Sequence, residues 1–121
     1  MSYVLFSDKS TKFAPPLITI RNGRISLSSG AGDYITGVGA RHVHLFWDAG
    51  AHKLAIKPVK KEDEHSFRVS IPAGRRGGTL SAESFLKFIR WTCKESISMA
   101  AQWNEAEQLL EVELPARYIA S

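Results

Sequence analysis

Cysteine is almost missing from this sequence, and long apolar runs are missing altogether. Cys93 is the single cysteine among 121 residues, so a framework of paired disulfides is excluded. No stretch approaches the ~20 apolar residues of a membrane span, and the first residues lack the basic segment that opens a secretory signal peptide. We therefore expect a cytoplasmic protein in which Cys93 is a buried thiol.

Neither apolar nor aromatic residues are scarce. They make up 44% and 10% of the chain, whereas disordered chains are poor in both. A chain of this length buries roughly two thirds of its unfolded surface. We expect one domain that spans residues 1–121.

Acidic residues are scarce in the first half of the chain. Residues 1–61 contain nine Lys or Arg against three Asp, and residues 62–121 contain seven against nine acids, within a formal net charge of +4. This asymmetry predicts a basic side and an acidic end, which concerns the partners of the protein rather than its fold.

Alternation of apolar and polar residues predicts β-hairpins. Residues 17–21 and 24–28 alternate in this way, and Asn22-Gly23 between them is the strongest short hairpin signal. Glycines make residues 29–37 a predicted turn. Further strands are expected at 41–47, 53–59, 66–71, 98–103 and 109–114.

One helix is predicted after a glycine-rich loop. Ser81 has the character of an N-cap. Phe85, Ile89 and Cys93 recur at four-residue spacing, which places an apolar stripe toward the core. We expect one main amphipathic helix at about 82–97.

The predicted fold class is α+β, with two similar β-hairpin-rich units and this helix. The units are residues 17–59 and 66–115, and the likeness includes Trp47-Asp48 before one strand and Trp103-Asn104 before another. Two interpretations stay open. The chain is an internal duplication, or two strand-rich halves share a pattern by chance.

Motifs of catalysis are missing. The chain has no Gly-x-Ser-x-Gly elbow and no phosphate-cradling Gly-x-x-x-x-Gly-Lys, and the helical register points Cys93 toward the core. His42 and His44 share one face of a strand, but a zinc site needs further ligands at a recognisable spacing. We predict no enzyme, no metal and no cofactor.

The basic residues carry the functional prediction. Cations that converge on a run of phosphates bind it by releasing counterions, and Trp91 would add base stacking. Exposed Lys and Arg are also ordinary surface residues. The sequence predicts a small, basic, non-catalytic regulatory protein that binds DNA or RNA. The candidate residues are Arg21, Arg24, Arg75, Arg76, Lys87, Arg90 and Lys94.

An alternative function comes from the acidic end of the chain. A cluster of glutamates there suits a basic protein surface better than phosphate. This predicts a mobile-element accessory or inhibitor protein that acts on a host protein by protein–protein interaction. A homodimer fits either function, and neither involves a membrane. The glutamates are Glu105, Glu107, Glu111 and Glu113.

Residues 20–58 resemble the AbrB/MraZ class of swapped-hairpin transition-state regulators. The likeness rests on Gly23-Arg24-Ile25-Ser26-Leu27 and on the later strand that ends Leu54-Ala55-Ile56-Lys57-Pro58. The family's proline after the first motif is Ser28 here, and glycine-rich sequence replaces its arginine-bearing helix. The resemblance implies DNA binding and transcription regulation. The chain also resembles small uncharacterised bacterial or mobile-element proteins, which implies no activity.

Overall fold

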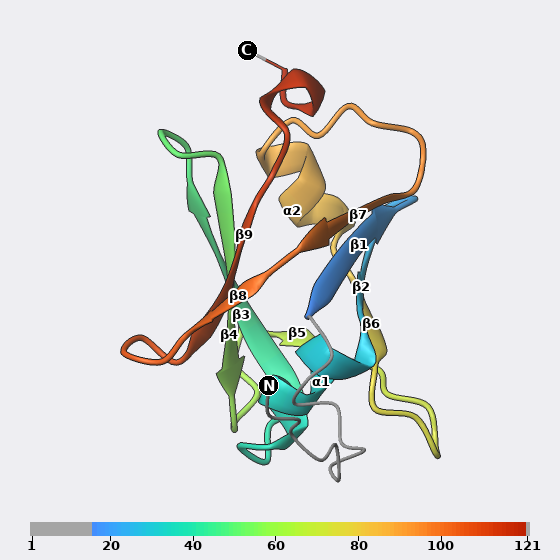
Figure 1. The fold of residues 1–121 in the computed structure, drawn as a ribbon, viewed down its shortest axis with the longest axis vertical. Coiled ribbons are helices and arrows are strands. Elements are labelled where there is room, and N and C mark those ends of the chain that lie inside the picture. The colour runs from blue at the N-terminus through green and yellow to red at the C-terminus, as the bar shows by residue number, and fades with distance from the viewer. Residues whose placement is uncertain (1–15, 121) are drawn as a thin grey trace, which may run out of the picture.

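The computed structural model describes residues 16–120, in which nine strands form two antiparallel sheets that face each other (Figure 1). The first sheet has the strand order β6-β2-β1-β7, and the second has the order β5-β3-β4-β9-β8. The strands are β1 (Leu17–Arg21), β2 (Arg24–Leu27), β3 (His42–Asp48), β4 (Lys53–Val59), β5 (Phe67–Arg68), β6 (Gly78–Ser81), β7 (Ile97–Ala100), β8 (Gln102–Asn104) and β9 (Leu109–Glu113).

The first hairpin forms as the sequence predicts. Asn22 and Gly23 both have positive φ, 48° and 76°, which is the geometry that lets a two-residue turn follow the twist of its strands. The strands expected at 41–47 and 53–59 are also confirmed, as β3 and β4. The strand expected at 66–71 shortens to β5, although Ser70 still bridges to Thr79.

Both long edges of the two sheets are joined, so the architecture is a flattened closed barrel. At one edge β7 continues into β8 through Ala101, whose amide donates to the Pro16 carbonyl at 2.9 Å. At the other edge Ser70 and Thr79 exchange two backbone hydrogen bonds, at 2.8 and 3.0 Å. The last predicted hairpin is therefore present, but its first strand crosses from one sheet to the other.

Two short helices lie at opposite ends of the space between the sheets (Figure 1). Helix α1 (Ser29–Thr36) occupies the stretch predicted as a turn, and the Ser28 side chain caps it by accepting from the Ala31 amide. Helix α2 (Glu83–Phe88) is much shorter than the helix predicted at 82–97. The fold is mixed and β-rich, and α2 is not its main feature.

Helix α2 ends early because the following residues find partners at the end of the chain. Arg90 has a left-handed φ of 63°, and Trp91 forms a β-bridge with Ile119. The Thr92 amide donates to the Tyr118 carbonyl at 2.7 Å, next to the 3-10 helix η2 (Ala116–Tyr118). Cys93 consequently leaves the helical stripe and is half-buried, not buried as expected.

The core lies between the sheets. Ile18, Ile25, Leu54 and Leu110 are fully buried on the inward faces of four strands, and the helices add further apolar side chains, including Phe85. Ser81, predicted as the N-cap of the long helix, instead ends β6, and Ala82 caps α2 without a side-chain hydrogen bond. Within residues 16–120, no helix has the length and apolar character needed to span a membrane.

The strand pairing has two-fold character. β2 pairs with β6 and β4 pairs with β9, each antiparallel. β1, which pairs with β2, also pairs with β7. In the same way β5 pairs with β3, and Ser70 just after β5 bridges to Thr79 of β6. Each half of the chain thus supplies strand partners to the other half.

Candidate nucleic-acid interface

Two of the predicted residues lie side by side at one end of the first sheet. Arg21 and Arg24 are cross-strand partners that flank the β1–β2 turn, and both are exposed. Ile20 and Ile25 beside them are buried, so the period of two along a strand sends the arginines outward. The outward face of this sheet therefore carries a pair of guanidinium groups at the turn.

A row of hydroxyl side chains crosses the same outward face. Thr19 of β1 lies opposite Ser26 of β2, which lies opposite Thr79 of β6, which bridges to Ser70. On the other side Thr19 lies opposite Ser98, and their hydroxyl oxygens are 2.7 Å apart. Hydroxyl groups are common ligands of nucleic-acid phosphates, so the row extends the polar character of the face beyond the arginines.

Arg75 and Arg76 lie at the other end of this sheet, on the loop between β5 and β6. The loop forms one wall of a groove of about 530 Å³, and the opposite wall is the junction between β2 and α1. Both arginines are exposed, and Arg76 lies 4.0 Å from the Asp33 carboxylate. Leu27 of β2 lies level with the groove, and β2 advances about 10 Å from Arg24 to Leu27.

Glycines hold the arginine-bearing loop against the barrel. A Cβ atom on Gly32 would lie 2.0 Å from the Arg76 carbonyl oxygen, and one on Gly77 would lie 2.4 Å from the Leu27 carbonyl oxygen. Real Cβ atoms do not approach so closely, so only glycine permits this contact. Gly32, one of the glycines that argued against a helix at 29–37, is therefore a packing residue.

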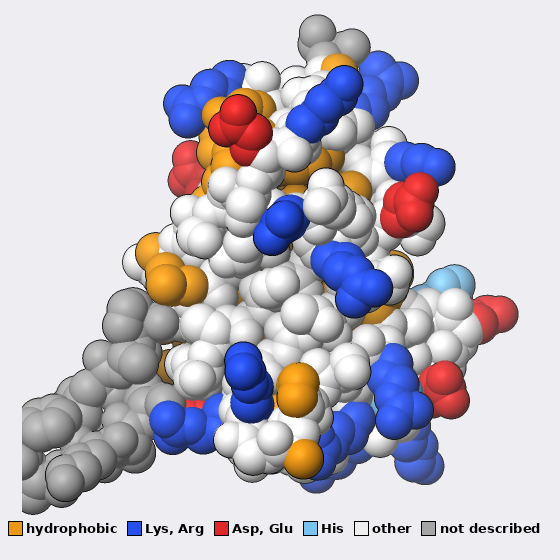
Figure 2. Space-filling view, turned by 90° about the vertical axis from the view of Figure 1, so that its right-hand side faces the viewer, with side chains coloured by type: hydrophobic (Ala, Val, Ile, Leu, Met, Phe, Trp, Pro, Cys, Tyr) orange, Lys and Arg blue, Asp and Glu red, His pale blue; other side chains and the backbone are white. Residues whose placement is uncertain are grey.

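The strands of the first sheet contribute charge of one sign only. Among the described residues, strands β1, β2, β6 and β7 contain no Asp or Glu. Figure 2 shows this side of the molecule, where Lys and Arg side chains run from one end to the other and the acidic side chains lie toward the rims. The long-range potential over this face therefore favours an anion.

The other three predicted cations do not form the expected helical stripe. Lys87 is on α2 and pairs with Glu83 at 3.3 Å, while Arg90 and Lys94 lie beyond the end of α2. Helix α2 does start beside the first turn, because the Ala82 amide donates to the Gly23 carbonyl at 2.8 Å. Lys87 thus borders the basic face, and all three cations are exposed.

The second sheet presents a different surface. On its outward face Lys53 lies between Asp48 and Glu113 in direct cross-strand register. The Lys57 ammonium donates to the Glu107 carbonyl at 3.1 Å. Lys53 and Lys57 therefore lie among the glutamates that suggested an acidic docking surface. Trp47 and Trp103 pack partly buried against the core, and Trp103 stacks on Tyr34 at a centroid distance of 4.5 Å.

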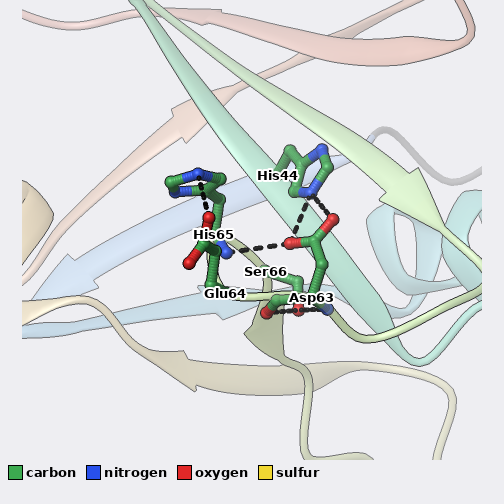
Figure 3. Close-up of polar contacts among 5 residues, drawn as sticks. All are labelled: His44, Asp63, Glu64, His65 and Ser66. Atoms are coloured by element: carbon green, nitrogen blue, oxygen red, sulfur yellow. Dashed lines mark hydrogen bonds and ion pairs between the residues drawn. The ribbon is translucent and has the colours of Figure 1, made fainter.

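His44 of β3 contacts the acidic loop that follows β4 (Figure 3). His44 Nε2 lies 2.9 and 3.1 Å from the two Asp63 carboxylate oxygens. The His65 amide donates to the same carboxylate at 2.8 Å, and this hydrogen bond is the main reason that the pKa of Asp63 is lowered; His44 lowers it further. This contact was not predicted from the sequence.

The hydrogen bonds of this cluster join the loop after β4 to β3 and hold the loop's own turn. The Ser66 hydroxyl accepts from the Asp63 amide and donates to the Asp63 carbonyl, both at 3.0 Å. Its hydrogen bonds therefore go to the backbone of Asp63 and not to His44. In the part of the chain that the structure describes, no group of three or more His, Cys, Asp or Glu is arranged to hold a metal ion.

No protein-family model matches the chain, and no curated protein or solved structure was found to be similar to it.

Proposed function

We propose that this protein binds nucleic acid, without catalysing a reaction, through the outward face of its first sheet. The observation that carries the proposal is the pairing of Arg21 with Arg24 at one end of that face and of Arg75 with Arg76 at the other. Hydroxyl groups lie between them, and the sheet itself contributes no acid. In this proposal the protein acts in the cytoplasm as a small regulator of DNA or RNA.

The spacing of the two arginine pairs supports phosphate contact. Along β2, Arg24 and the Leu27 end beside the arginine loop are three residues, or about 10 Å, apart, which corresponds to about three steps of 3.4 Å along one strand of a duplex. Contacts of this kind position a protein on its target and carry no base information. Among the described residues, the strands of this sheet present no aromatic side chain for stacking, which favours a duplex over a single strand.

The proposal predicts binding that weakens steeply with salt. Each phosphate contacted contributes about −0.9 to the slope of log affinity against log salt for duplex DNA, so four arginine contacts give a slope of about −3.6. We expect Arg24→Ala to make this slope about 0.9 less negative. Fluorescence anisotropy of a labelled 16-base-pair DNA duplex, and of the matching RNA duplex, between 20 and 200 mM NaCl measures it.

Lys53→Ala is the matched control, because it removes one positive charge from the outward face of the second sheet. It should leave both affinity and slope nearly unchanged. Absence of binding to either duplex at the lowest salt would refute the proposal. If Lys53→Ala weakened binding as much as Arg24→Ala, binding would reflect net charge alone and the assigned face would be wrong.

Internal duplication and the swapped-hairpin class form a second part of the proposal. The exchange of strand partners between the two halves supports both, because each pairing in one half has a counterpart in the other. The interaction with a host protein is the less favoured alternative, since Lys53 and Lys57 lie among the glutamates on which it depended. Capture of a protein partner that survives nuclease treatment would favour that alternative.

A further inference from the structure

The groove beside the β5–β6 loop is larger than phosphate contact alone requires. Its volume of about 530 Å³ falls within the range of about 300–1,000 Å³ typical of small-molecule sites. The groove opens on the outward face of the first sheet, since Ser26 and Thr79 belong to both. A lone phosphate would leave most of this space to water.

Charged and polar groups line the groove from two sides. Arg75 and Arg76 stand on the loop wall, and the hydroxyls of Ser26, Ser70 and Thr79 line the sheet side. Among residues 16–120 these three hydroxyls have no side-chain hydrogen-bond partner. They are therefore available to a ligand, as donors to phosphate oxygens or as partners of sugar hydroxyls.

Ser28 also lines the groove, but its hydroxyl already has hydrogen-bond partners and is not among the proposed ligand-binding groups. Its Oγ accepts from the Leu17 amide at 2.9 Å and from the Ala31 amide at 3.3 Å. It thereby fixes the start of β1 and of α1 on one wall, while Gly77 lets the loop approach on the other side. The groove is thus held in shape by the hydrogen bonds of the Ser28 side chain and by the close backbone packing at Gly77, which favours a pre-formed site.

We infer that this groove binds one nucleotide unit. Arg75 and Arg76 hold its phosphate, the hydroxyls of Ser26, Ser70 and Thr79 bind the phosphate and sugar oxygens, and Pro72 on the loop wall offers an apolar surface to the base. Arginine favours phosphate because its planar fork of donors matches two phosphate oxygens. The unit is either a free nucleotide or one unpaired nucleotide of a polynucleotide, because a base stacked inside a duplex cannot reach the loop wall. The inference rests on the proposed function, because Arg75 and Arg76 belong to both.

The test uses the full chain labelled with ¹⁵N and titrated with AMP, adenosine and inorganic phosphate. AMP should shift the amide resonances of residues 26–29 and 74–79, whereas adenosine should bind at least tenfold more weakly because it lacks the charged group. Arg75→Ala should weaken AMP binding about tenfold or more, and Thr79→Val, which keeps the shape of the side chain, about threefold to tenfold.

Arg24→Ala separates this inference from the proposed function. It lies outside the groove, so it should weaken the duplex and leave AMP binding unchanged. A single-stranded oligonucleotide distinguishes the two sources of the nucleotide, because its unpaired bases are free to enter the groove. If it shifts the same groove resonances as AMP, a polynucleotide unit occupies the groove; if AMP shifts them and the oligonucleotide does not, the site is assigned to a free nucleotide.

Two results would overturn the inference. If the duplex binds but AMP at 10 mM shifts no groove resonance, the groove site is wrong and the proposed function stands. If AMP binds equally well to wild type, Arg75→Ala and Thr79→Val, the nucleotide occupies another place. If AMP binds in the groove but no polynucleotide binds, the proposed function fails while the nucleotide site survives.

Discussion

At the scale of single residues, Asp63 is the clearest case of a side chain whose charge the fold uses. The His65 amide and the His44 ring hold its pKa below the ordinary value of 3.8. A carboxyl group with a depressed pKa in the folded state stabilises the fold above its unfolded pKa, and this stabilisation is lost as the pH falls through the folded value.

We therefore expect Asp63→Asn to lower the free energy of unfolding at pH 7, with the difference from wild type closing as the pH falls below about 4. Urea unfolding at pH 7, 5, 4 and 3 measures it. Glu64→Gln is the control, because its side chain is 84% exposed, and it should follow the wild-type curve. A deficit in Asp63→Asn that stays constant over the whole pH range would show that charge is not the cause.

Residue patterns predicted single contacts unevenly. Asn22-Gly23 predicted its turn because a two-residue hairpin is a local structure, decided by the φ angles of its own residues. The contact between His44 and Asp63 joins residues 19 positions apart, and nothing in the local pattern specifies which acid of the loop reaches the strand. The predicted cations are all exposed, but only the fold decides which of them share a face.

At the scale of elements, the packing of the arginine loop against β2 and α1 depends on Gly77. We expect Gly77→Ala to destabilise the fold by about 1–3 kcal/mol, because its Cβ would meet backbone atoms that have little room to move. It should also weaken duplex binding by moving Arg75 and Arg76. Thermal unfolding and anisotropy measure the two effects.

Gly50→Ala is the matched control for this substitution. Its Cβ would meet only the Asp48 side chain, at 3.5 Å, which is ordinary van der Waals contact. A wild-type melting temperature is expected for it. If Gly77→Ala melted like wild type and bound duplex normally, the loop would not depend on this close contact.

Elements were predicted well where periodicity alone decides them, and less well where a competing partner exists. β3 and β4 follow the alternation of their residues. The predicted helix at 82–97 was wrong after Phe88 because pairing of Trp91 with Ile119 replaces helical hydrogen bonds. Helix α1 was not predicted because each of its glycines costs a helix up to about 1 kcal/mol. The packing that offsets this cost exists only in the folded chain and cannot be seen in the local sequence.

At the scale of the whole molecule, the two halves of the chain hold each other. β4 pairs with β9 and β2 pairs with β6, and buried apolar residues line all four strands. Alone, the first half would keep the β1–β2 and β3–β4 pairings and the second half the β8–β9 pairing, but every pairing between the halves would be lost. Each half would therefore expose strand edges and apolar faces.

We expect fragments 1–60 and 61–121 to be unfolded or aggregated when separate and to fold when mixed. The cut falls between Lys60 and Lys61, which are both exposed. Circular dichroism of each fragment and of the equimolar mixture checks this, and a cut between Leu54 and Ala55, inside β4, is the control that should fail to reassemble. Stable folding of residues 61–121 alone would contradict the interlocked pairing.

The late arrival of β9 has a consequence for synthesis on the ribosome. β3 and β4 emerge well before residues 109–113, so one edge of β4 stays unpaired during synthesis. An unpaired edge can associate with other nascent chains. Its sequence carries Lys53, Lys57 and Pro58, the residue types that discourage edge-to-edge aggregation. The lysines that lie beside glutamates in the folded sheet thus also protect the unpaired edge of β4 from aggregation until β9 pairs with it and closes the barrel.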